Sequence, residues 1–240
     1  MVGPGIVQYL AAAKPVFAVT LTVGSYLFAL KLSRRFGSHP LVNPTLVAIL
    51  VVDATLWALR VDYADYLAGA SPIQMLLGPA VVGLALPIVR YGAILGARLQ
   101  SLALALIIGC PLAVCSVIGV GHMLGGTRSM LLSLAPRSTT TAVAMGIAEQ
   151  IGGIPQLTAV LTISTGIIAA VLGVHMMDLL GIRDPVGRGF ALGLGGHGIA
   201  TARAFQESQM AGAAAGLEMG LSTVASALLV PLLVRLIGLG

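Results

Sequence analysis

Long apolar runs follow one another along most of this 240-residue chain. A helix needs about 20 apolar residues to cross a bilayer, and only helices and closed barrels satisfy their backbone hydrogen bonds there. Charged residues make up 9% of the chain, against about a quarter in soluble domains. The sequence therefore predicts an all-α membrane protein with about seven or eight transmembrane helices. The runs cover about residues 15–32, 44–60, 73–90, 94–124, 155–180, 186–206 and 209–238, with a more polar run at 129–150.

Two polar breaks interrupt this apolar pattern, at residues 136–141 and 195–203. Within hydrocarbon, irregular backbone and charge are tolerated only where protein or a water-filled cavity surrounds them. Broken helices of this kind are typical of transporters that bind a solute near the middle of the membrane. The breaks therefore indicate a protein that moves a small polar solute, held between them.

The first break carries the components of an anion site. Arg137 supplies a cation for a carboxylate, and a helix that starts nearby supplies free backbone N–H groups. The neighbouring hydroxyl groups can orient the substrate, and they belong to Ser138, Thr139, Thr140 and Thr141. The alternative is a headgroup loop in which Arg137 extends to the membrane surface.

The second break contains four glycines between residues 193 and 198, and helix is expected to resume near Ile199. His197 and Thr201 are four residues apart and can share a helix face beside Gly198. Arg203 points elsewhere unless the break redirects it. We predict that these four residues bind substrate, while His197 can alternatively be a packing residue or a group that carries a proton.

Two carboxyl groups inside apolar runs are further candidates for proton coupling. Asp53 lies in the middle of one run and Glu218 in another. An unpaired carboxylate is costly there, so each is protonated, paired or close to the membrane surface. Asp53, Glu218 and His197 are therefore the candidate proton carriers.

Two parts of the chain resemble each other in the same order, which predicts internal repeats. Residues 44–50 parallel residues 155–161, and the run containing Gly78 and Pro79 corresponds to residues 195–198. We therefore predict that Gly78 and Pro79 also bind substrate. We expect one transmembrane domain over residues 1–240, with an N-terminal span at 1–40, repeat 1 at 41–124 and repeat 2 at 125–240.

The positive charges favour inverted repeats with broken, crossing helices. If residues 129–150 do not cross the membrane, seven full spans remain, with the N-terminus outside, and the cations cluster on the cytoplasmic side. If residues 129–150 cross, the repeats are parallel. The clustered cations are Lys31, Arg34, Arg35, Arg90, Arg98, Arg183, Arg188 and Arg235.

Several of these segments resemble the LrgB family. The resemblance covers about residues 40–235, in Pro136-Arg137-Ser138-Thr139-Thr140, Gly152-Gly153-Ile154-Pro155, Leu77-Gly78-Pro79-Ala80 and His197-Gly198-Ile199-Ala200-Thr201-Ala202-Arg203. Arg137 replaces a common lysine, and Ala142 replaces a common proline. The arginine keeps the charge but changes its geometry, which leaves the substrate open.

The resemblance implies two functions. Bacterial members of the family are described as antiholin-like regulators of murein hydrolases and lysis, with a small LrgA or CidA partner. Plant plastidic relatives transport glycolate and glycerate, and bacterial members are associated with pyruvate. The broken helices favour a transporter of small monocarboxylates. We expect it to be coupled to protons or to exchange one substrate for another. The alternative is a holin-like regulator.

Other classes of function have little support in the sequence. There is no motif for zinc, nucleotides or a catalytic nucleophile, so we expect no enzyme, metal or cofactor. The net charge of +5 is spread between apolar runs, which argues against nucleic acid as a partner. We expect a homodimer in a lipid bilayer, in a bacterial inner membrane. Residues 1–13 lack the pattern of a cleavable signal peptide.

Overall fold

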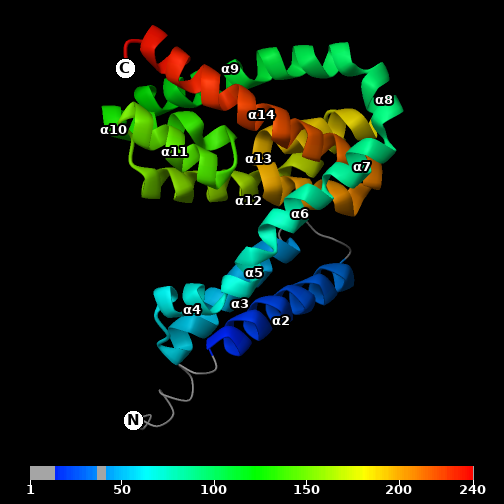
Figure 1. The fold of residues 1–240 in the computed structure, drawn as a ribbon, viewed down its shortest axis with the longest axis vertical. Coiled ribbons are helices and arrows are strands. Elements are labelled where there is room, and N and C mark those ends of the chain that lie inside the picture. The colour runs from blue at the N-terminus through cyan, green and yellow to red at the C-terminus, as the bar shows by residue number, and fades with distance from the viewer. Residues whose placement is uncertain (1–13, 37–41, 240) are drawn as a thin grey trace. The chain divides into compact units, whose positions relative to one another are not determined.

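The computed structural model describes residues 14–36 and 42–239, and all its regular elements in those ranges are helices (Figure 1). Contacts divide the chain into two units, residues 1–83 and 84–240. The first unit contains α2 (Lys14–Arg35), α3 (Pro44–Leu59), α4 (Tyr63–Gly69), α5 (Ser71–Met75) and α6 (Leu77–Gly83). The second contains α7 (Ala85–Arg90), α8 (Gly92–Ala97), α9 (Leu99–Met123), α10 (Arg128–Leu134), the 3₁₀ turn η2 (Ala135–Ser138), α11 (Thr141–Ile151), α12 (Pro155–Leu179), α13 (Pro185–Glu207) and α14 (Gln209–Leu236).

Five helical segments in the described ranges are long and apolar enough to cross a membrane: α2, Ser71–Arg90, α9, α12 and α14. The 16 residues of α3 form a shorter apolar helix. This pattern confirms the predicted all-α membrane fold. The predicted count of seven or eight spans is not confirmed, because residues 129–150 and 186–206 fold back on themselves. The single domain and the two repeats stay predictions, as does the absence of a signal peptide in residues 1–13, which lie outside the described ranges.

The first unit is a helical bundle in which α2 packs on α3 and α4. Lys14 and Asp65 form an ion pair of 2.8 Å between the starts of α2 and α4. The hydroxyl groups of Thr22 and Tyr66 are also 2.8 Å apart. Asn43 caps α3, because its side chain accepts a hydrogen bond from the backbone of Thr45.

In the second unit, residues 128–151 form a hairpin, which we call hairpin 1. Pro136 lies in η2, and Thr139 and Thr140 are extended, so the helix ends and α11 starts in a new direction. The chain then returns to α10, since the backbone N–H of Ile154 donates to the Ser133 hydroxyl at 2.8 Å. The Thr158 hydroxyl donates to the Ser133 carbonyl at 2.9 Å. Residues 129–150 therefore fold back instead of running straight on.

The helix α13 also folds back, and we call residues 185–207 hairpin 2. The break lies at Gly196 and His197, whose backbone angles are not helical. Arg188 near the start binds both carboxylate oxygens of Glu207 at the end, at 2.8 and 3.0 Å. A straight helix would separate residues 19 positions apart by roughly 28 Å. The two halves of α13 must therefore run antiparallel.

The fold of α13 contradicts two predictions: that residues 186–206 form a single span, and that Arg188 and Arg235 lie on the same side. Residues 186–206 were expected to cross the membrane as a single span, but the non-helical angles at Gly196 and His197 turn them back. The following helix, α14, starts beside the first half of α13: a Cβ at Gly189 would clash with the Ala211 carbonyl group. Arg235 therefore lies at the opposite end of α14 from Arg188, not on the same side.

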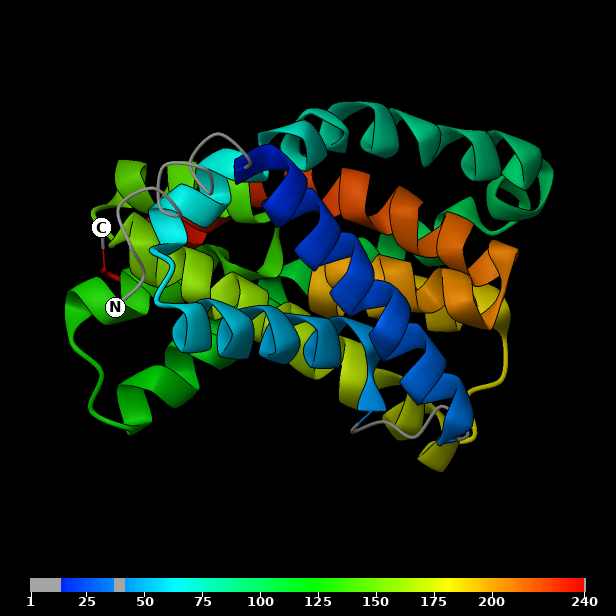
Figure 2. The same cartoon turned by 90° about the horizontal axis from the view of Figure 1, so that it is seen from below.

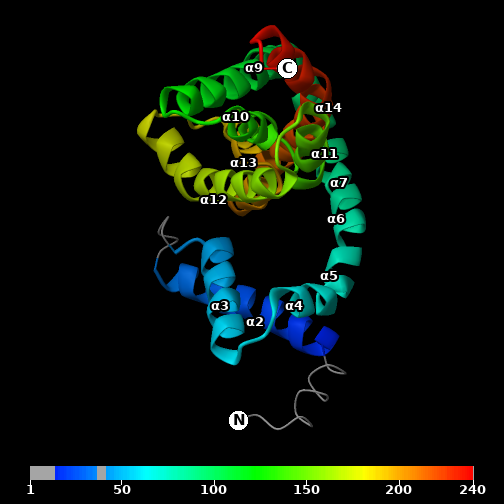
Figure 3. The ribbon, with the colours of Figure 1, turned by 90° about the vertical axis from the view of Figure 1, so that its left-hand side faces the viewer.

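The helix α12 connects the bases of the two hairpins, which enter from opposite ends of the unit. Its 25 residues span roughly 37 Å, enough to cross the hydrocarbon core. The other end of α14 lies near the base of hairpin 1, since Arg128 donates to the Leu239 carbonyl at 3.0 Å. Figure 3 shows α10, α11 and α13 enclosed by α9, α12 and α14, and Figure 2 shows α14 running beside α13.

Candidate functional site

The tips of the two hairpins meet beside the middle of α12. From hairpin 1, the guanidinium group of Arg137 donates to the Thr165 hydroxyl at 3.4 Å. From hairpin 2, the carbonyl oxygen of Gly196 lies 3.1 Å from where a Cβ of Gly166 would be. Thr165 and Gly166 are about halfway along α12. The two predicted breaks are thus in one place, where η2 contacts both α12 and α13.

The tip of hairpin 1 presents a cation, hydroxyl groups and the start of a helix. Ser138 and Thr139 are buried, and the Thr139 hydroxyl contacts the Thr223 hydroxyl of α14 at 3.4 Å. Thr140 is the N-cap of α11, but its side chain makes no capping hydrogen bond. The first backbone N–H groups of α11, beginning at Thr141, therefore have no partner within the helix.

The tip of hairpin 2 holds His197 in an unusual conformation. Its φ of 46° and ψ of −130° lie in a region that is normally reserved for glycine. Its side chain is 3% exposed. The imidazole lies within electrostatic range of the Arg137 guanidinium and beside the Arg137 backbone carbonyl. The strained backbone position thus coincides with a ring that lies beside hairpin 1.

Several buried polar atoms at this tip lack a hydrogen bond of good geometry among the described residues. Both ring nitrogens of His197 lack a hydrogen bond of good geometry, and so does the hydroxyl of Thr201, one turn further on. Thr201 is 2% exposed. Buried polar groups are usually hydrogen-bonded, and each exception needs an explanation. A polar solute bound between the tips would satisfy these atoms.

The electrostatics at the tips favour an anion. The half-helices that begin at α11 and after His197 both direct the positive end of their dipoles toward the junction. Arg137 adds a full positive charge without an ion pair among the described residues. A small carboxylate fits this combination of N–H groups, guanidinium and hydroxyl groups.

The strain at His197 gives a testable comparison of two variants. His197→Gly and His197→Ala both remove the imidazole, but only glycine adopts the observed backbone angles without strain. We expect His197→Gly to be more stable than His197→Ala by about 1 kcal/mol, measured by thermal unfolding in detergent. Equal stability of the two would show that the backbone at residue 197 is not strained.

The remaining predicted residues of this unit lie at the edge of the site or away from it. Gly198 is exposed beside His197. Arg203 is half-buried, and its guanidinium contacts Gln206 of the same half-helix at 3.5 Å. The break has therefore not redirected Arg203 onto a described partner at the tips.

Three predicted residues belong to the first unit. Gly78 and Pro79 lie on α6, and Asp53 lies on α3 with an exposed side chain. The roles of Gly78 and Pro79 in binding and of Asp53 in proton coupling stay predictions.

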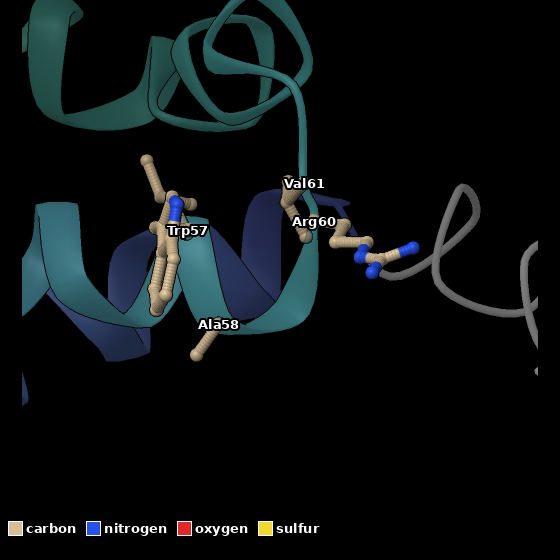
Figure 4. Close-up of a pocket in the computed structure, with 5 residues that line it drawn as sticks. Trp57, Ala58, Arg60 and Val61 are labelled. Atoms are coloured by element: carbon tan, nitrogen blue, oxygen red, sulfur yellow. The ribbon is translucent and has the colours of Figure 1, made fainter.

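A pocket of the first unit lies at the end of α3 (Figure 4). The Arg60 side chain extends away from the Trp57 ring, and Val61 and Ala58 add no polar side chain. None of the predicted site residues lines it. Polar groups do not converge there, so the pocket contributes nothing to the candidate site.

Sequence reasoning missed two residues that contact the tips. Thr165 of α12 binds Arg137, and Thr223 of α14 binds Thr139. A signal for Thr165 was present, because Ser164, Thr165 and Gly166 form a small polar group within an apolar run. Thr223 had a similar signal, because Ser222 and Thr223 are adjacent polar residues within the apolar run of α14.

Comparison with known proteins places the chain in a family. The profile of the LrgB-like family matches residues 22–236. The uncharacterized protein YxaC of Bacillus subtilis is 32% identical over 92% of this chain and 96% of its own length. The holin-like protein CidB is 28% identical in Staphylococcus epidermidis, over 95% of this chain and 98% of the relative. The holin-like protein CidB of Staphylococcus aureus is 28% identical over 91% of this chain and 95% of its own length. No solved structure matches the chain. The family profile covers most of the chain, which therefore belongs to the LrgB-like family.

Proposed function

We propose that this protein is a secondary carrier for small 2-hydroxy or 2-oxo monocarboxylates, such as glycolate, glycerate or pyruvate. The observation that carries the proposal is the meeting of two hairpin tips beside Arg137, where the Thr201 hydroxyl has no described partner and the His197 ring nitrogens lack a hydrogen bond of good geometry. A pore would not need such a preformed anion site. The carboxylate binds Arg137 and the N–H groups of α11, and the substrate hydroxyl or carbonyl oxygen binds His197 and Thr201.

Hairpins from opposite ends also suit alternating access. Each hairpin separates the tips from one end of the unit, so displacement of one hairpin at a time would expose the site to one side only. We assign no catalytic role to any residue. The carrier is proposed to act as a homodimer in a bacterial inner membrane, with repeats of inverted orientation. A small partner of the LrgA or CidA type is a further proposed component.

A second candidate function is a holin-like regulator of lysis, and it rests on the relatives named holin-like protein CidB. In this case oligomers would change membrane permeability without selecting a solute. The two functions are compatible if lysis follows from a changed flux of metabolites.

Uptake into proteoliposomes separates the two functions. We expect saturable uptake of labelled glycolate, glycerate or pyruvate, with inhibition by the unlabelled compound and no release of a trapped dye. A holin-like protein should instead release unrelated dyes, increasingly with protein density. Absence of saturable uptake of all three compounds, with and without a pH gradient, would contradict the carrier.

A further inference from the structure

Glu218 is a buried carboxyl group that substrate binding does not use. It lies in α14 and is 0% exposed. Its Oε2 atom accepts a long hydrogen bond of 3.4 Å from the Ser222 hydroxyl, whereas Oε1 has no partner among the described residues. A negative charge in such a place has a large desolvation cost.

The surroundings of Glu218 do not provide a compensating positive charge. The thiol of Cys110 from α9 lies within electrostatic range. None of the ion pairs in the described ranges includes Glu218, although the packed elements η2 and α7 carry Arg137 and Arg90. In α13, Arg188 is paired with Glu207 and Asp178. Of the other charged or titratable groups on elements packed against α14, Glu149 of α11 and Cys115 of α9 are exposed. The rest are His122, His197 and Arg203.

Glu218 is close to the tips of both hairpins. A Cβ at Gly193 would lie 2.9 Å from Oε2, so the first half of α13 approaches the carboxyl group directly. Gly193 is one turn before His197. On the other side, Thr223 is next to Ser222 and contacts Thr139 of hairpin 1. The carboxyl group therefore packs against α13 one helical turn before the break and lies on α14 five residues before the contact with hairpin 1.

We propose that Glu218 is the binding site for the transported proton, with Ser222 as its hydrogen-bond partner, and that one proton moves with each monocarboxylate anion. The inference rests on the proposed carrier function. Protonation removes the uncompensated charge of Glu218, and it also removes the repulsion between Glu218 and a bound anion. Proton and anion therefore favour each other's binding. A small metal cation fits less well, because one carboxylate and one hydroxyl are too few oxygen ligands.

The decisive variant is Glu218→Gln, which imitates the protonated state. In proteoliposomes that are acidic outside, the wild type should accumulate substrate by up to about tenfold for each unit of pH difference. Glu218→Gln should lose this accumulation entirely but retain exchange of labelled for unlabelled substrate. Glu149→Gln is the matched control, because its carboxylate is exposed on α11, and it should accumulate like the wild type.

Three results would overturn the assignment while leaving the carrier intact: accumulation by Glu218→Gln, wild-type uptake that ignores the pH gradient, or accumulation that follows a sodium gradient. Absence of both uptake and exchange in the wild type would instead contradict the carrier itself. If Glu218→Gln does not fold, the assignment is tested on the wild-type protein with dicyclohexylcarbodiimide. This reagent modifies protonated carboxyl groups. Labelling at Glu218 that falls as pH rises supports the assignment, and absent or pH-independent labelling overturns it.

Discussion

Arg137→Ala is expected to abolish saturable uptake of monocarboxylates, while Arg137→Lys retains part of it. A hydrogen bond to a charged group contributes about 1.5 to 3 kcal/mol, which corresponds to a fall of about 10- to 150-fold in affinity or rate. Lysine keeps the positive charge but loses the planar fork of the guanidinium group. Initial rates over a range of substrate concentrations measure the effect.

Arg128→Ala is the control for this experiment. Arg128 lies at the base of the same hairpin, is exposed, and contacts the Leu239 carbonyl instead of the tips. It should leave half-saturation and maximal rate close to those of the wild type. An unchanged half-saturation and rate in Arg137→Ala would place Arg137 outside the substrate site.

Arg188→Ala is expected to lower the free energy of unfolding by about 2 kcal/mol, more than an exposed ion pair contributes and less than a fully buried one. The Arg188 and Glu207 side chains are 12% and 17% exposed, and they join the two ends of hairpin 2. Removal of Arg188 leaves the half-buried Glu207 carboxylate without its partner. Thermal or denaturant unfolding in detergent measures the change.

The ion pair between Arg98 and Asp184 provides a comparison, because its side chains are 48% and 42% exposed. Exposed pairs contribute about 0 to 1 kcal/mol, so Arg98→Ala should have a small effect. If Arg98→Ala and Arg188→Ala destabilise the protein equally, the closure of hairpin 2 does not depend on Arg188.

The membrane fold and the positions of the breaks could be predicted, because both depend on local composition. Apolar length predicts α9, α12 and α14, and glycine and proline mark the breaks beside Arg137 and His197. The direction of the chain after a break could not be predicted. A hydropathy pattern is the same for a kinked span and for a hairpin, and the pairing of Arg188 with Glu207 across 19 residues leaves no local signal.

The different burial of the Asp53 and Glu218 carboxyl groups could likewise not be predicted from the sequence. Asp53 and Glu218 both lie within apolar runs, yet Asp53 is exposed on α3 and Glu218 is completely buried in α14. The difference comes from packing, since Gly193 allows α13 to approach α14 closely. The sequence therefore identifies both carboxyl groups as candidates for proton coupling but does not indicate which of them is buried.

Because the hairpin tips lie halfway along α12, a charge bound there lies about halfway across the electric field of the membrane. A monovalent anion bound there experiences about half of the membrane voltage, so its binding energy from either side changes by about 1.2 kcal/mol for each 100 mV. An anion that arrives together with a proton bound at nearly the same depth carries no net charge through this field. The membrane voltage would then have little effect on the transport of anion and proton together, although it would act on an anion or a proton that binds alone.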